Sequence, residues 1–223
     1  MPNWCDYSVS FHGDAEVIKE LDNAFKVPPD EIDPDDEYRD YDLTLVLPIP
    51  EDLKITATYF DIDVVQEDPE REALRQQYIA NKEKYGHPNW YDWCVEKWGT
   101  KWAPDIYSIE GSSTSLHISG MSAWGPPGNL IAHITGQYPV EAYLSYKEDG
   151  MCFAGMDAFA HGEMVYDGYF QYDEVPSISA AQEAIDWDAD DYEDGYQAFC
   201  DAIEDEVARR EAEAMTALVK ERN

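Results

Sequence analysis

Histidine, cysteine and serine side chains most often bind metals or attack substrates, but here their spacing matches none of the common catalytic or metal-binding patterns. The five histidines and four cysteines share no spacing typical of zinc ligands. The segment from Gly120 to Trp124 begins like the turn that presents a nucleophilic serine, yet it lacks the closing glycine. No glycine-rich phosphate-binding or dinucleotide-binding loop occurs. We therefore favour a non-catalytic protein without a metal or organic cofactor, and a metal site built from distant segments is the alternative.

One segment partly matches a calcium-binding loop. Asp186, Asp188 and Asp190 occupy its first three ligand positions. The sixth position is Asp191, where the loop needs glycine, and the twelfth is Gln197, where it needs glutamate. This pattern predicts diffuse attraction of cations and no specific calcium site.

The net charge is extreme, because 48 acidic residues face 15 Lys and Arg, a formal −33. Such a chain repels nucleic acids and anionic membranes, so we expect it to bind neither directly. The acidic residues concentrate in residues 30–42 and 183–206, and the second cluster contains no Lys or Arg. This uneven distribution argues against a uniformly acidic surface.

Aromatic residues are interleaved with the second acidic cluster, as in the anchors of protein interfaces. On a helix, Asp186, Asp190 and Asp194 would follow one another about 6 Å apart, which approaches the charge density of a nucleic-acid backbone. A basic protein surface is therefore the expected partner, bound by Asp186, Asp188, Asp190, Asp191, Glu193, Asp194, Trp187 and Tyr192. A solvated acidic face is the alternative explanation, and we favour it for residues 30–42.

The first residues have the pattern of a strand followed by a helix. Apolar and polar residues alternate from Cys5 to Phe11, which predicts a strand with one buried face. Asp14 can cap a helix whose apolar residues recur at helical spacing as far as Phe25. Leucines at alternate positions over residues 43–47 predict a second strand, so the chain is expected to begin as β-α-β.

Residues 51–105 are expected to be mostly helical. Good helix formers fill residues 70–85. Aromatic and apolar residues then recur at every fourth position between Trp90 and Trp98, which predicts a helix with an aromatic stripe. Gly99 suits the left-handed residue that follows a helix end.

The second half of the chain alternates strands and turns before a helical tail. Strands are expected at residues 106–109, 113–124, 140–146, 151–160 and 164–172, with a short helix near residues 130–134 and helix from residue 177. A change of face after Ile118 predicts a β-bulge at Gly120. Asp149 and Gly150 form a strong hairpin signal. An apolar stripe continues along the tail from Tyr196 to Val219.

The tripeptide Pro-Asn-Trp occurs at residues 2–4 and again at residues 88–90. The first copy leads into a strand and the second into a helix, so a duplicated domain is not expected. Lys101 is expected to lie on an indole face as a cation–π pair between Trp98 and Trp102. The tryptophans of these segments are interpreted as core anchors: Trp4, Trp90, Trp98 and Trp102.

The four cysteines lie among apolar or aromatic neighbours, and the chain shows neither an export signal nor an apolar run long enough to cross a bilayer. We therefore expect buried, reduced thiols and a cytoplasmic protein.

Four segments resemble the YubB-like family of phage and plasmid proteins: MPNWC at the start, NWYDWCVEKWGTKW at 89–102, SAWGPP at 122–127 and GMCFAG at 150–155. The usual family forms are close to MPNWC-N, NWC-x-x-NWGTKW-D and AWSPP, and Asp6 and Gly125 depart from them. The resemblance covers about residues 1–175. It implies a ferredoxin-like domain and a phage or mobile-element origin, and it implies no catalytic residue.

The expected fold class is α+β. It consists of a ferredoxin-like antiparallel sheet packed with helices, a helical insertion at about residues 51–105 between the second and third strands, and a long C-terminal helix. We expect one domain over residues 1–175 and an acidic helical extension over residues 176–223.

Charge and resemblance together predict an accessory protein of a phage or mobile element. It would bind a basic surface of a host protein in the host cytoplasm and act as a nucleic-acid mimic in counter-defence. The alternative is a small-ligand-binding protein or enzyme with a pocket on the sheet near residues 90–102. Ferredoxin-like sheets also present aromatic side chains to RNA bases, but the shortage of Lys and Arg opposes this third function.

Overall fold

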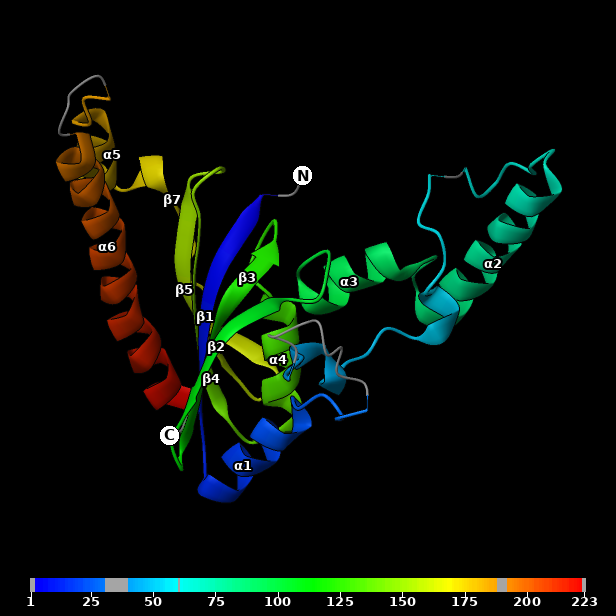
Figure 1. Ribbon diagram of the computed structural model, residues 1–223, viewed down its shortest axis with the longest axis horizontal. Coiled ribbons are helices and arrows are strands. Elements are labelled where there is room, and N and C mark those ends of the chain that lie inside the picture. Colours follow the sequence, from blue (N-terminus) through cyan, green and yellow to red (C-terminus); the bar gives the residue numbers. More distant parts are fainter. Residues whose placement is uncertain (1–2, 31–39, 60, 188–191, 222–223) are drawn as a thin grey trace.

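The structure, a computed structural model, describes residues 3–30, 40–59, 61–187 and 192–221. Its centre is an antiparallel sheet with the strand order β2-β3-β1-β4-β5-β6 and with β7 beside β5 (Figure 1). The strands are β1 (Trp4–His12), β2 (Asp105–Gly111), β3 (Ser115–Ala123), β4 (Glu141–Glu148), β5 (Phe153–Ala160), β6 (Glu163–Tyr166) and β7 (Phe170–Gln171). The helices are α1 (Ala15–Ala24), α2 (Pro69–Tyr85), α3 (Trp90–Trp98), α4 (Gly128–Gln137), α5 (Pro176–Glu183) and α6 (Tyr192–Glu221), with 3-10 helices η1 (Leu43–Val46), η2 (Glu51–Leu53) and η3 (Tyr172–Glu174).

The segment β1-α1-β2-β3-α4-β4 has the ferredoxin-like topology, which confirms the predicted fold class. Strand β1 lies between β3 and β4, and β2 lies outside β3. All of these pairs are antiparallel. Strands β5 to β7 extend the sheet beyond β4 through the predicted hairpin at Asp149 and Gly150.

The main core lies between this sheet and helices α1, α3 and α4. Alternate residues of β1 from Cys5 to Phe11 are buried, which confirms the predicted strand and its buried face. They pack in one cluster with residues of the three helices, including Ile18, Leu21, Trp93, Trp98, Leu130 and Ile131. Because side chains alternate across a strand, Ser8 and Ser10 lie on the opposite face of the sheet.

The predicted second strand, residues 43–47, is wrong, because this segment forms η1 and the residue that follows it, Leu47. The carboxylate of Asp42 accepts hydrogen bonds from the backbone N–H and the hydroxyl of Thr44, each at 2.7 Å, and so caps the 3-10 helix. Leu43 nevertheless joins the core. The helical insertion therefore lies between α1 and β2, and the second strand of the ferredoxin-like topology is β2, which follows the insertion.

Both predicted helices of the insertion are present, with their end signals. Asp68 accepts hydrogen bonds from the backbone at the start of α2, and Gly86 ends it with a φ of 80°. Asn89 caps α3 in the same way, and Gly99 ends it with a φ of 83°. Figure 1 shows α2 apart from the sheet and α3 close to it.

The predicted β-bulge is misplaced. The register shift lies in β2 between Ile106 and Ser108, opposite Gly120, whereas β3 keeps its alternation through Gly120. A Cβ on Gly120 would lie 1.8 Å from the carbonyl oxygen of Asp105. The glycine is therefore needed for the close approach of the neighbouring strand.

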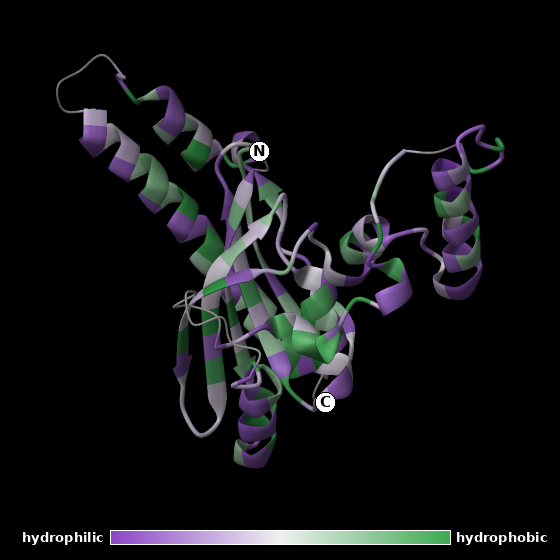
Figure 2. Cartoon of the chain, turned by 45° about the vertical axis from the view of Figure 1, so that its right-hand side comes forward, coloured by the Kyte–Doolittle hydropathy of each residue, from purple (hydrophilic) through white to green (hydrophobic). Residues whose placement is uncertain are grey.

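The opposite face of the sheet is covered in part by α6, the predicted C-terminal helix. Its Ala214 and Leu218 pack with Met156 and Ala158 of β5, and hydrophilic and hydrophobic residues are mixed along it (Figure 2). The predicted apolar stripe is correct at Phe199, Ile203 and Leu218 but wrong at Met215 and Val219, which are 47% and 54% exposed. The division of the chain at residue 175 stays a prediction.

Candidate functional site

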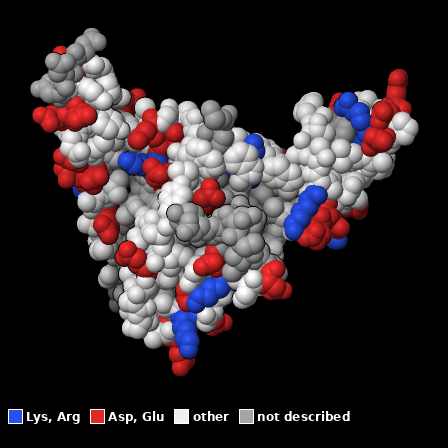
Figure 3. All heavy atoms as spheres, in the orientation of Figure 1, with Lys and Arg blue, Asp and Glu red and all other residues white. Residues whose placement is uncertain are grey.

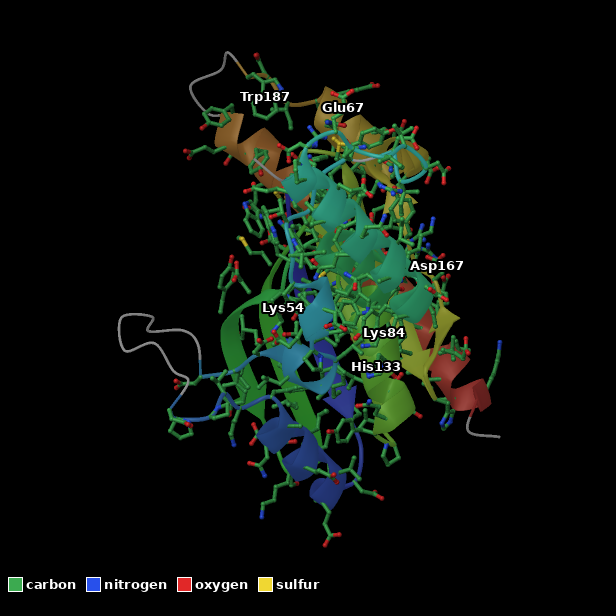
Figure 4. The ribbon with its side chains drawn as sticks, turned by 90° about the vertical axis from the view of Figure 1, so that its right-hand side faces the viewer. Lys54, Glu67, Lys84, His133, Asp167 and Trp187 are labelled. Carbon is green, nitrogen blue, oxygen red and sulfur yellow. The ribbon has the colours of Figure 1, made fainter. Side chains whose placement is uncertain are left out.

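Those predicted partner-binding residues that the structure describes lie at the tip of a hairpin formed by α5 and α6. Asp186 and Trp187 follow α5, and Tyr192, Glu193 and Asp194 begin α6. The indole of Trp187 is 63% exposed at the far end of this hairpin (Figure 4). The other predicted residues, Asp188, Asp190 and Asp191, lie outside the described residues.

The exposed aromatic rings of this tip contact one another in tilted orientations. The ring of Trp187 lies 6.2 Å from Tyr192 and 6.3 Å from Tyr196. Tyr196 contacts the buried ring of Phe199, which in turn packs edge-on against Tyr172. The exposed rings are thus continuous with a small core beneath them, which favours a fixed aromatic surface.

Asp186 and Asp194 do not share one helix as the expected row of carboxylates requires, because Asp186 lies outside both helices and Asp194 lies in α6; Asp190 lies outside the described residues. The acidic groups instead stand on both arms of the hairpin, and Figure 3 shows Asp and Glu side chains gathered over this part of the molecule. Arg209 and Arg210 both bind Glu206. Within the described residues, no lysine or arginine forms a salt bridge with the acidic residues nearer the tip: Glu193, Asp194, Asp201, Glu204 and Asp205.

A second feature is a groove of about 440 Å³ between α6 and the face of the sheet that carries Ser8 and Ser10. The sheet contributes His117, Tyr143 and polar residues of β4 to its floor, and α6 contributes a wall of both apolar and acidic side chains. These wall residues are Cys200, Ile203, Glu204, Val207, Ala208 and Glu211. The groove lies on the sheet as the alternative function requires, but none of residues 90–102 lines it.

His117 joins two serine hydroxyls on the floor of this groove. Its Nε2 lies 3.0 Å from the Oγ of Ser8, and its Nδ1 lies 2.8 Å from the Oγ of Ser10. Each hydroxyl can donate or accept, so either tautomer of the ring satisfies both contacts. In a catalytic triad, a carboxylate binds one ring nitrogen of the histidine and orients the ring toward the nucleophile. Here a serine hydroxyl holds that position, which favours a polar binding surface over a catalytic site.

Sequence reasoning missed this group of hydroxyls and imidazole because the strand register creates it. Ser10 pairs with His117 across β1 and β3, although more than 100 residues of chain separate them. Alternation within β1 indicated which face its serines occupy, but nothing local indicated which histidine lies opposite.

A third feature is an exposed group of aromatic rings at one end of the sheet. Trp4 is 41% exposed and Trp102 is 38% exposed, so their interpretation as core anchors is wrong. Trp90 is half-buried, whereas Trp98 is buried as predicted and its Nε1 donates to the carbonyl oxygen of Leu47 at 3.0 Å. Trp4 and Trp102 contact each other instead, with ring centroids 6.1 Å apart.

The predicted cation–π contact of Lys101 exists with Trp102, and Trp124 and Tyr91 are its other partners. Its Nζ lies 4.4 Å from the ring centroid of Trp102, 5.0 Å from Trp124 and 5.7 Å from Tyr91. Trp98 is not among these rings. The three aromatic residues come from separate segments and surround one ammonium group.

Asp157 is a buried carboxyl that no sequence pattern indicated. It is 4% exposed, and it accepts hydrogen bonds from the backbone N–H of Gly168 at 3.0 Å and from the hydroxyl of Tyr146 at 3.3 Å. Burial raises the pKa of Asp157 to about 6, and the charge of nearby Asp167 (Figure 4) acts in the same direction. The carboxyl holds the bend between β6 and β7.

The four cysteines are free, as predicted, but only Cys5 and Cys94 are buried, and Cys152 and Cys200 are partly exposed. Burial raises the pKa of the Cys5 and Cys94 thiols to about 12, so these two are poor nucleophiles.

The described residues contain no group of three or more metal-binding side chains that could hold an ion. Within the same described ranges, no helix has both the length and the apolar character required to cross a membrane.

The chain is similar to one family model, described as the ferredoxin-like domain in Api92-like protein, over residues 97–219. This range is more than half of the chain, and it crosses residue 175. A solved structure, protein api92 from Yersinia pseudotuberculosis, matches with 11% sequence identity and a TM-score of 0.43, covering 76% of this chain and 98% of that one. No curated protein matches this chain.

Proposed function

The chain belongs to the family of Api92-like proteins with a ferredoxin-like domain, and from this starting point we propose that it is a non-catalytic binding protein. Its α5–α6 hairpin tip would hold a basic surface of another protein. The ferredoxin-like sheet would act as the scaffold that carries this hairpin, with α6 packed against β5. Function would then depend on surface charge and exposed rings.

One observation carries the proposal. Trp187, Tyr192 and Tyr196 form an exposed cluster of aromatic rings at the hairpin tip, and the chain from residue 183 to residue 206 contains no Lys or Arg. Aromatic side chains supply most of the binding energy in many interfaces, and surrounding charges select and steer the partner. A basic surface with an apolar pocket complements both properties.

The proposal includes the finer expectations about the partner. Carboxylates on two arms can imitate the charge density of a nucleic acid, so we propose that the partner's basic surface is a nucleic-acid groove of a host protein. The phage or mobile-element origin and the role in counter-defence rest only on the resemblance to YubB-like proteins.

The first experiment is capture of partners from host lysate with the intact protein, followed by binding kinetics. Association should slow steeply as salt rises, because the Debye length falls from about 30 Å at 0.01 M to about 10 Å at 0.1 M. Dissociation should change less. Duplex DNA should compete for the captured protein, and a partner that ignores both salt and DNA would contradict the nucleic-acid mimicry.

A charge-reversal variant locates the interface. Changing Asp186, Glu193 and Asp194, which are all exposed, to Lys should weaken binding without unfolding, since exposed substitutions usually change stability by under about 0.5 kcal/mol each. The matched control reverses three exposed acids of the insertion, Glu67, Glu70 and Glu83, and changes the net charge equally. Equal binding by both variants would show that the hairpin tip is not the interface.

The groove between α6 and the sheet supports a second candidate function, the binding of a small ligand. Its volume of about 440 Å³ is within the range of small-molecule sites, and hydroxyls, an imidazole and apolar side chains all line it. A ligand screen by thermal shift tests this function. A ligand that raises the melting temperature of the wild type should not raise that of Ser10→Leu, because the leucine side chain occupies the floor of the groove. An unchanged shift in Ser10→Leu would place the ligand elsewhere.

A further inference from the structure

The aromatic group around Lys101 unites motifs that the hairpin-tip proposal does not use. Trp4 opens β1, Tyr91 belongs to the first turn of α3, Trp102 follows α3, and Trp124 follows β3. These residues come from the Pro-Asn-Trp segments and from the SAWGPP segment. Segments far apart in the sequence therefore place aromatic rings around one ammonium group. We refer to Tyr91, Trp102 and Trp124 as the aromatic cage.

The cage holds its cation through ring faces. All three ring centroids lie within 6 Å of the Nζ of Lys101, the distance at which cation–π attraction is effective. The chain has 48 acidic residues. In the part of the chain that the structure describes, Lys101 nevertheless forms no salt bridge with a carboxylate. The site thus selects a cation by ring geometry rather than by an opposing charge.

Backbone contacts hold the cage in place independently of Lys101. Trp124 has a φ of 72°, which is unusual for a residue other than glycine, and its N–H donates to the carbonyl oxygen of Asn3 at 2.9 Å. The buried hydroxyl of Thr100 donates to the carbonyl oxygen of Ala123 at 2.8 Å. Such a backbone conformation persists only where its surroundings enforce it, and it is frequent at functional sites.

The cage is also open to solvent. Trp102 and Trp124 are 38% and 43% exposed, and Trp4 extends the aromatic surface beside Trp102. Lys101 lies on a flexible side chain, so its ammonium can leave the rings without a change in the backbone. A lysine ammonium is strongly hydrated in water, which makes its release inexpensive.

We propose that the aromatic cage is a binding site for a quaternary or methylated ammonium group, and that Lys101 is an internal occupant which this ligand displaces. Methyl groups spread the charge and reduce its hydration, so a methylated ammonium loses less hydration than Lys101 when it enters the rings. Three rings around one cation are the arrangement that recognises choline-like groups and methylated lysine. This site is separate from the hairpin tip, so either proposal can fail alone.

The experiment titrates the intact protein with two probes and follows tryptophan fluorescence and calorimetric heat. One probe is tetramethylammonium, and the other is a short Gly-Ser peptide with one trimethyllysine. The same peptide with unmodified lysine is the ligand control. Tighter binding of the methylated peptide assigns the site to a partner protein, and tighter binding of tetramethylammonium assigns it to a small quaternary amine.

The decisive variant is Lys101→Ala, which empties the cage and keeps its rings. Its affinity for both probes should rise about fivefold, the factor that corresponds to about 1 kcal/mol. Trp102→Leu should abolish binding, whereas Trp187→Ala, which removes an exposed tryptophan of the hairpin tip, should not change it. Circular dichroism reports whether each variant is folded.

A direct measurement of displacement does not depend on any tryptophan variant. Ring currents should shift the proton resonances of the Lys101 methylene groups in the free protein, and saturating probe should return them to the positions of an exposed lysine. The proposal is overturned if Lys101→Ala binds neither probe, if unmodified lysine peptide binds it as tightly as the methylated one, or if those resonances stay unchanged when a probe binds.

Discussion

Replacing Asp157 with asparagine should change how the stability of the protein depends on pH. The carboxyl of Asp157 is buried and accepts hydrogen bonds from the N–H of Gly168 and the hydroxyl of Tyr146. Asparagine has the same shape, and its carbonyl oxygen can keep the bond to Gly168. The hydroxyl of Tyr146 donates to the same oxygen, Oδ1, so the asparagine carbonyl oxygen can accept this bond as well. The substitution therefore removes a buried charge and keeps both contacts.

The magnitude follows from the pKa of the buried group. The pKa of Asp157 rises from 3.8 to about 6 in the folded protein, and one pKa unit corresponds to about 1.4 kcal/mol. The charged carboxyl therefore destabilises the folded state by about 3 kcal/mol. The pKa of Asp157 is higher in the folded state than in the unfolded state. The stability that the wild type gains from keeping this carboxyl neutral is therefore fully present below about pH 4 and is lost as the pH rises through about 6.

The assay is urea unfolding followed by circular dichroism at a series of pH values. The free energy of unfolding of Asp157→Asn minus that of the wild type should increase by about 2.5 kcal/mol between pH 4 and pH 7. The other carboxyls titrate in both proteins and cancel in this difference. Asp173→Asn, at an exposed position, is the matched control and should show a nearly constant difference. A constant difference for Asp157→Asn would refute the argument from burial.

Three further outcomes test the assignment of buried and exposed groups. Trp98→Ala should lower the free energy of unfolding by about 3–5 kcal/mol because the indole is buried, whereas Trp4→Ala should cost about 1 kcal/mol or less; equal losses of melting temperature would contradict this. Gly120→Ala should prevent normal pairing of β2 and β3, since its Cβ would meet a backbone oxygen, and a wild-type melting curve would disprove that close approach. Iodoacetamide at pH 8, followed by mass spectrometry, should label the partly exposed thiols of Cys152 and Cys200 before the buried thiols of Cys5 and Cys94. The reverse order of labelling would count against this assignment.

The regular elements could be predicted because each has a local signal. Alternation identified β1, and residues that cap and end helices located α2 and α3. The turn at Asp149 and Gly150 located the hairpin of β4 and β5. The error at residues 43–47 has a physical reason, since three leucines at alternate positions occur in a 3-10 helix as well as in a strand when a side chain such as Asp42 caps the turn.

The sites depend on contacts that no local signal encodes. A tryptophan between polar residues can be a core anchor or a surface ring, and only the packing of distant segments placed Trp98 in the core and Trp4 beside Trp102 at the surface. The bulge was predicted in β3 but lies in β2 for a similar reason, because the register is set by the pairing of two strands and not by one strand alone.

The sequence by itself determined the extreme negative charge, the concentration of acid between residues 183 and 206, and the order of most helices and strands, because these properties depend on neighbouring residues. Only the tertiary structure decided that His117 meets two serines, that Asp157 is buried and that three rings surround Lys101. Each of these arrangements joins residues from separate strands, helices or connecting segments. Their positions follow from sheet register and helix packing, which the whole chain sets together.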